Sequence, residues 1–154
     1  MALALCVRSA KPAVVAQYKF ALVKFQKGVL GAQKNIFFSP QHRVLVQGWQ
    51  SELLFGPSEI LVPAVALVNG TSVTRAPRAK VTYVQLMFDR HQLVTCSGFV
   101  SESFFPHESD LRALTGMQAE IQTFFPRAIA AAHGKSGFVR PVEEGRMTQL
   151  LGAV

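Results

Sequence analysis

Short apolar runs separated by turn-forming residues dominate the chain from residue 20 to residue 100. Runs such as "ALVKF", "NIFF" and "RVLVQ" are too short for a helix, and several alternate between apolar and polar positions, which is typical of half-buried strands. Ser39-Pro40 lies between two of these runs and predicts a turn. Asn69-Gly70 predicts a two-residue hairpin, because both central positions of a type I′ turn need positive φ. The pattern therefore predicts a mainly β domain.

One longer segment, "KVTYVQLMF" (80–88), is apolar on both faces of the predicted strand. We place it centrally in a sheet, because a strand covered on both faces has a nearly continuous apolar sequence. The run "HQLVTCSGFV" (91–100) is its expected partner, joined to it through a turn at Asp89-Arg90. Cys96, in the middle of that run, is expected to be a small buried residue.

After residue 106 the apolar spacing becomes helical. Thr115 and Gln118 have capping-box spacing ahead of "AEIQTFF", and Pro126 is expected to end or kink this helix. "RAIAAAHG" adds a last turn, so one or two short helices follow the β domain. Residues 135–154 show no clear period and predict a loose tail.

The composition is that of a globular chain, with 154 residues, 49% of them hydrophobic and 16% charged. The longest apolar run, "ILVPAVALV" (60–68), is about half of what a membrane-spanning helix needs. We therefore predict no transmembrane segment, and no secretory signal is present either, which favours a cytoplasmic location. Cys6 and Cys96 are too few for a disulfide framework and too far apart for a zinc site, so neither a metal nor a cofactor is predicted.

The net charge of +7 is unevenly distributed, since the first 51 residues contain seven Lys or Arg and no acid. One interpretation is a solvated strand face; the other is a binding surface for nucleic acid or an anionic envelope. Aromatic residues of the stacking kind do not alternate with the lysines, which favours the solvated face and gives no clear nucleic-acid partner. The binding module remains an alternative, and it predicts binding that falls steeply with salt.

Several strings in order, "FALVKFQKGVLG", "FFSPQHRVLVQGWQSELLFG", "ILVPAVALVNG", "VTYVQLMFDRHQLV" and "GFVSESF", resemble the bacterial Hint family of hedgehog/intein-type autoprocessing domains. The resemblance implies an interlaced β-strand fold, incomplete at its amino end. It divides the chain into a non-matching segment (1–17), a partial Hint-like domain (18–105), a helical extension (106–134) and the tail (135–154).

The resemblance also implies a site. In that family a cysteine attacks the carbonyl before it, and the histidine of a Thr-x-x-His element acts on the departing amide nitrogen. Ser39 and His42 occupy this element here, with serine in place of threonine. His91 resembles the second histidine of splicing members, and Asp89 lies near enough in sequence to orient it. Alternatively, Asp89, Arg90 and His91 form only a polar hairpin turn.

The residues that would complete the chemistry differ from the family pattern. Cys6, in "LALCVRSAKP", does not resemble the opening cysteine motif, and "VSES" (100–103) stands where splicing members end in His-Asn. These departures predict a truncated and catalytically inactive Hint-type domain. The alternative is an active self-cleaving or split-intein-like half that uses a thiol from Cys6 or from a partner.

A missing amino-terminal segment would leave sheet edges exposed. The expected partners are therefore that segment, a host polypeptide, or a second copy of the chain associating through those edges.

Overall fold

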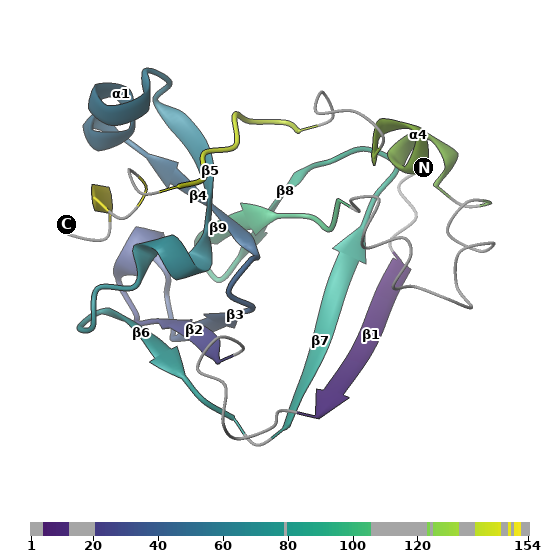
Figure 1. The fold of residues 1–154 in the computed structure, drawn as a ribbon, viewed down its shortest axis with the longest axis horizontal. Helices are drawn as coiled ribbons and strands as arrows, with labels where there is room; N and C mark the ends of the chain where they lie inside the picture. Colours follow the sequence, from purple (N-terminus) through teal and green to yellow (C-terminus); the bar gives the residue numbers. More distant parts are fainter. Residues whose placement is uncertain are drawn as a thin grey trace.

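The computed structural model describes residues 5–12, 21–78, 80–105, 123, 125–132, 138–145, 148 and 150–151. Over these residues the fold is mainly β, as the sequence predicts (Figure 1). The strands form three sheets, with orders β1-β7, β3-β2-β6 and β5-β4-β9-β8. The strands are β1 Leu5–Pro12, β2 Leu22–Phe25, β3 Ile36–Phe38, β4 Arg43–Gln47, β5 Glu59–Pro63, β6 Val73–Ala76, β7 Lys80–Met87, β8 Leu93–Cys96 and β9 Phe99–Glu102. The helices are α1 Trp49–Phe55, α4 Pro126–Ala132 and the short 3-10 turns η2 Val29–Gly31 and η3 Ala64–Leu67.

The four-stranded sheet supplies most of the core. β4 and β5 pair antiparallel, from Arg43 opposite Pro63 to Gln47 opposite Glu59. Three consecutive residues of β4 and four of β5 are buried, so both faces of these strands are covered. Strands of this kind carry continuous apolar sequence, as "VLV" and "ILVP" do here. β4 and β5 are therefore buried on both faces, with β4 inside the sheet and β5 at its edge.

The three-stranded sheet closes the core from the other side. In β2 buried and partly exposed residues alternate, with Val23 and Phe25 facing inward. The Phe25 ring packs against Phe99 of the four-stranded sheet, with 5.0 Å between ring centroids. Aromatic pairs at this spacing add to the stabilisation from burial alone. The two sheets thus share one apolar core.

The predicted turn at Ser39-Pro40 is confirmed, and it connects the two sheets. It follows β3, which pairs with β2, and precedes β4, which pairs with β5 and β9. The turn closes with the His42 N–H donating to the Ser39 carbonyl at 3.1 Å. His42 is therefore placed at the point where the chain passes from one sheet to the other.

The two-residue hairpin lies at a different place from the predicted one. Asn69-Gly70 follows η3, and the Asn69 side-chain oxygen accepts hydrogen bonds from the backbone N–H groups of Thr71 and Val73. This is a local turn built on an Asn side chain. Ser97 and Gly98, with φ of 49° and 78°, instead make the tight turn between β8 and β9. Two consecutive positive φ values are the mark of the hairpin turn.

The predictions for residues 80–100 need correction. β7 forms a two-stranded ribbon with β1, from Lys80 opposite Pro12 to Met87 opposite Leu5, and it extends beside the other sheets rather than lying centrally (Figure 1). The expected partner, residues 91–100, bends back at Ser97-Gly98 and becomes the β8–β9 hairpin. Cys96 lies at the end of β8 and is exposed, because the strand stops there.

The helices differ in part from those predicted. α1 is an unpredicted helix between β4 and β5, and Trp49 in its first turn is 66% exposed. Pro126 is the first residue of α4, a position that suits proline because its missing N–H loses no hydrogen bond there. The helix expected before Pro126 lies mostly outside the described residues. No helix among the described residues is long and apolar enough to cross a membrane.

The carboxyl-terminal segment also differs from the loose tail that the sequence predicts. Val142 forms a parallel bridge with Leu61 of β5. Further along, Thr148 is 1% exposed and Leu151 is 7% exposed, and Leu151 belongs to the main core cluster. The described residues of this segment are thus part of the folded domain.

Candidate functional site

The turn that carries His42 is fixed on both sides by backbone hydrogen bonds. The Pro40 carbonyl accepts from the N–H of Val65 at 3.0 Å, and the His42 carbonyl accepts from the N–H of Ala64 at 2.9 Å. Both donors belong to η3, so this short helix holds the turn in place. An open hollow of about 480 Å³ lies beside it, and its lining includes Gln41, Arg75 and Glu144.

The His42 ring stacks on an aromatic side chain of the preceding strand, β3. It lies parallel to the Phe38 ring, with 4.7 Å between centroids and an interplanar angle of 8°. The residue as a whole is partly exposed, but its Nε2 atom is buried and has no hydrogen-bond partner among the described residues. Burial lowers the pKa of His42 below its ordinary value, and the charges of Arg43 and His91 act in the same direction, while Glu102 opposes them. His42 is therefore a neutral imidazole with one unengaged ring nitrogen.

His91 is held by the hairpin that follows it. The pairing of β8 with β9 continues beyond Leu93, because Ser103 N–H donates to the Gln92 carbonyl at 2.7 Å and Gln92 N–H donates to the Ser103 hydroxyl at 3.0 Å. This register brings His91 next to Glu102. The His91 side chain is fully buried, with Phe105 and Phe138 edge-on against its ring.

Both ring nitrogens of His91 are engaged. Nε2 lies 3.1 Å from Oε2 of Glu102, and Nδ1 accepts a hydrogen bond of 3.1 Å from the backbone N–H of Val139. A backbone N–H can only donate, so Nδ1 carries the lone pair and Nε2 carries the proton. The arrangement is a carboxylate-oriented histidine, which is how many proteins fix the tautomer of a base.

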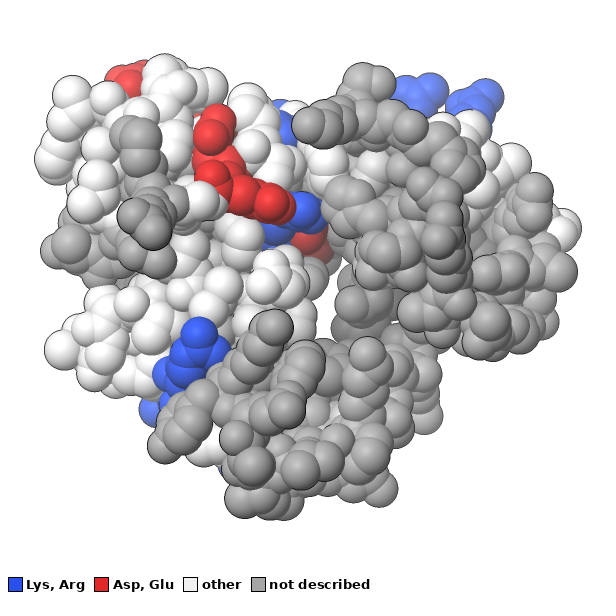
Figure 2. Space-filling view, in the orientation of Figure 1, with Lys and Arg blue, Asp and Glu red and all other residues white. Residues whose placement is uncertain are grey.

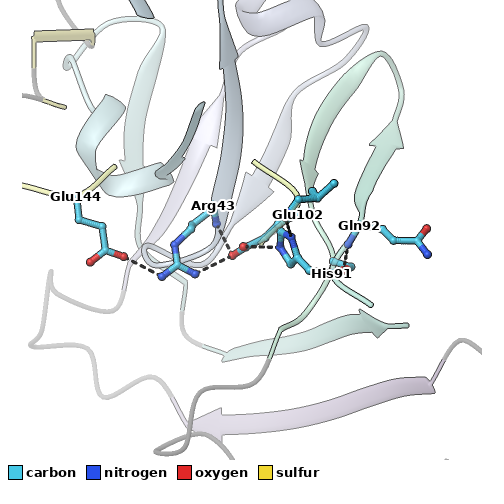
Figure 3. Close-up of polar contacts among 7 residues, drawn as sticks. Arg43, His91, Gln92, Glu102 and Glu144 are labelled. Atoms are coloured by element: carbon cyan, nitrogen blue, oxygen red, sulfur yellow. Dashed lines mark hydrogen bonds and ion pairs between the residues drawn. The ribbon is translucent and has the colours of Figure 1, made fainter. Parts of the chain in front are cut away.

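Glu102 joins the two histidine-bearing elements through Arg43 (Figure 3). Its Oε1 accepts from the backbone N–H of Arg43 at 3.1 Å and lies 3.5 Å from Arg43 Nη1. Arg43 also contacts Oε1 of Glu144 through Nη2, at 2.8 Å. A chain of polar contacts thus runs from Glu144 through Arg43 and Glu102 to His91.

The structure gives each predicted site residue a position. His42 lies near enough to Glu102 and His91 for the charges of both residues to affect its pKa. Ser39 closes the His42 turn through its carbonyl. Asp89 precedes His91, but the carboxylate on the His91 ring belongs to Glu102, so Asp89 is not its orienting partner. His91 is also not an exposed turn residue, because it is 4% exposed.

Sequence reasoning missed Glu102 and Arg43 as parts of this site. Glu102 had been considered only as a residue that replaces the His-Asn end of splicing members. The signal that would have found it is the Ser97-Gly98 turn, because the hairpin register from that turn places Glu102 opposite Leu93.

The two cysteines lie on different strands, β1 and β8. The backbone of Cys6 lies opposite Leu86 in the β1–β7 ribbon. Cys96 is exposed at the end of β8 opposite Phe99, while Leu93 at the other end pairs with Glu102. Among the described residues there is no group of three or more His, Cys, Asp or Glu that could hold a metal ion.

Charged side chains on the surface do not form one basic face in the view drawn. In Figure 2 the described acidic side chains gather near the middle, and the described basic side chains lie in separate groups. A nucleic-acid interface needs a continuous basic patch or stripe. This face therefore gives the binding-module interpretation no support.

The fold and the site together define a class of protein: a mainly β domain with a histidine in the turn between two sheets, His42, and a second histidine that a buried glutamate orients, His91. A family model described as the Hint domain matches residues 6–108, which is more than half of the chain. The chain belongs to the Hint domain family. The match begins inside the segment 1–17, which the sequence resemblance had left out. No curated protein and no solved structure matches the chain.

Proposed function

We propose that this chain is a Hint-type domain, related to self-cleaving proteins, that does not itself cleave a peptide bond. The observation that supports this most is the state of His91. Both of its ring nitrogens are engaged inside the protein, so in this conformation neither is free to exchange a proton with a substrate. A base or acid must reach the group whose proton it transfers.

The position of Cys96 supports the same proposal. In an N–S acyl shift, a thiolate sulfur attacks a carbonyl carbon, a C–S bond forms, the C–N bond breaks, and the departing nitrogen takes a proton from an acid. By its resemblance to the family's Thr-x-x-His element, His42 is the residue that would supply this proton. Cys96, however, is exposed at the end of β8 opposite Phe99 rather than beside Glu102.

One observation favours the active alternative. The Nε2 atom of His42 is buried and unpartnered, and burial keeps the ring neutral. Such a nitrogen can accept a proton from a thiol or pass one to an amine. A thiol supplied by Cys6 or by a partner polypeptide would then complete the first step of Hint chemistry.

The test is the intact mass of the protein fused behind a small amino-terminal tag, before and after incubation with dithiothreitol. We expect an unchanged mass. Loss of the tag at one bond, dependent on both thiol and His42, would overturn the proposal. The His42→Ala variant tests the histidine, and Cys6→Ser with Cys96→Ser as its matched control would identify the thiol.

A further inference from the structure

Residues 138–145, here called the strap, lie along the edge of the four-stranded sheet. Leu61 N–H donates to the Pro141 carbonyl at 2.8 Å, and Glu143 N–H donates to the Leu61 carbonyl at 2.9 Å. These bonds form a one-residue parallel bridge on β5. The strap therefore covers an edge that would otherwise be open to another strand.

Two ion pairs hold the strap on the sheet. Arg140 Nε lies 2.5 Å from Oε2 of Glu59, and Arg43 Nη2 lies 2.8 Å from Oε1 of Glu144. Three of the four side chains are at least one-third exposed, and ion pairs in contact with water stabilise only weakly. The strap is thus fastened by contacts that can open locally without unfolding the core.

The strap reaches His91 through its backbone. Val139 is 40% exposed as a residue, yet its N–H points inward and occupies Nδ1 of His91. Beside it the Phe138 ring packs on His91, with 5.1 Å between centroids, and Arg43 lies 5.0 Å from the centre of the same ring. The Val139 N–H covers Nδ1, which carries the lone pair of the ring. The other nitrogen, Nε2, carries the proton and points toward Glu102 (Figure 3).

We propose that His91 and Glu102 form a general base that the strap masks. Glu102 orients the ring, as the third member of a catalytic triad does, and Nδ1 is the nitrogen whose lone pair would accept a proton. When the strap opens, Nδ1 becomes available to another N–H or O–H donor. A ligand that takes the place of the Val139 N–H must also donate a hydrogen bond to Nδ1, so the fitting ligand class is a main-chain amide or a hydroxyl. The inference goes beyond the proposed function, since it concerns access to His91 and holds whether or not the chain cleaves a bond.

The test is the rate at which diethyl pyrocarbonate modifies each histidine, followed by peptide mass mapping. This reagent acylates an unprotonated imidazole nitrogen, which in His91 is Nδ1. In the Arg140→Ala/Glu144→Ala variant we expect the rate constant at His91 to rise about tenfold, because losing two exposed ion pairs raises the open population by about that factor. A second variant, Val139→Pro, removes the N–H itself and should also speed modification.

The matched control is Glu52→Ala/Arg127→Ala. It removes the same two residue types from α1 and α4, where both are exposed, and neither has a hydrogen bond or ion pair to the strap in the described part of the chain. We expect its His91 rate to equal that of the parent protein. Hydrogen exchange at the Leu61 and Glu143 amides would report strap opening in each variant. Faster modification of His91 in either strap variant supports the proposal; an unchanged rate in both, with native circular dichroism, overturns it.

Discussion

The carboxylate of Glu102 affects His42 and His91 in different ways. His91 has its proton and its lone pair both assigned by neighbours, Glu102 and the Val139 N–H. His42 has a stacked ring and a buried Nε2 with no hydrogen-bond partner among the described residues, and the charge of Glu102 acts on its pKa. Both ring nitrogens are therefore engaged in His91, whereas Nε2 of His42 is not.

The stability of the protein should depend on pH through His42. Burial lowers its pKa in the folded state below the ordinary 6.5, so the unfolded chain takes up the proton first as the pH falls. The stability linked to the neutral ring is present above about pH 6.5 and declines as the pH falls toward the folded pKa. Urea midpoints at about pH 8 and about pH 5.5 would measure this decline. The His42→Phe variant keeps a stacking ring but cannot titrate, so we expect its urea midpoint to fall less between the two pH values. An equal fall in the variant and the parent protein would contradict the role of His42.

Glu102 should matter more for stability than Glu144, although both contact Arg43. Glu102 is 9% exposed and serves Arg43 and His91 together, whereas Glu144 is 59% exposed. Removing one partner of a buried network leaves polar groups unpaired and costs about 2–4 kcal/mol, while an exposed pair contributes about 1 kcal/mol or less. Urea denaturation of Glu102→Ala beside Glu144→Ala would test this. Equal losses would mean that Glu102 does not organise the network.

At the scale of elements, the position of the site depends on turns more than on strands. The Ser39–His42 turn passes between sheets, and the Ser97-Gly98 turn sets the register that pairs Leu93 with Glu102. Gly98 also lies against the carbonyl of Gly31 in η2, and a Cβ at Gly98 would fall inside contact distance of that oxygen. The hairpin therefore tolerates only glycine at this position.

Gly98→Ala and Gly70→Ala form a matched pair that tests this turn. Both glycines have φ of 78°, but a Cβ at Gly70 meets nothing within 4 Å. We expect Gly70→Ala to cost about 1 kcal/mol, the price of positive φ alone, and Gly98→Ala to cost about 2–4 kcal/mol because the backbone must also shift. Thermal unfolding would measure both changes. Similar losses would show that η2 moves away freely and that the close approach is unimportant.

At the scale of the whole molecule, the carboxyl-terminal segment completes the domain. Leu151 lies in the core cluster and lines a cavity of about 270 Å³ with Phe25, Val46 and Val73. The strap that precedes it holds the β5 edge and covers His91. The end of the chain thus contributes to both the core and the site.

Leu151→Ala and Leu150→Ala compare two neighbouring leucines with different surroundings. Leu151 is 7% exposed and Leu150 is 54% exposed. We expect about 2–4 kcal/mol of destabilisation for Leu151→Ala, from lost burial and an enlarged cavity, and less than about 0.5 kcal/mol for Leu150→Ala. Chemical denaturation would separate them. Equal, small effects would mean that this segment is not part of the core in solution.

The short strands, the Ser39-Pro40 turn and the Hint family could be predicted from the sequence, because each depends on local periodicity, turn chemistry or motif order. The sequence did not determine that β7 pairs with β1 or that residues 91–100 form a hairpin, since the same apolar pattern suits several sheet partners. Only the tertiary structure decided that Glu102 orients His91 and that Val139 covers it. Buried polar groups must find partners wherever the fold brings a donor or acceptor near, and here one of those partners lies 48 residues further along the chain.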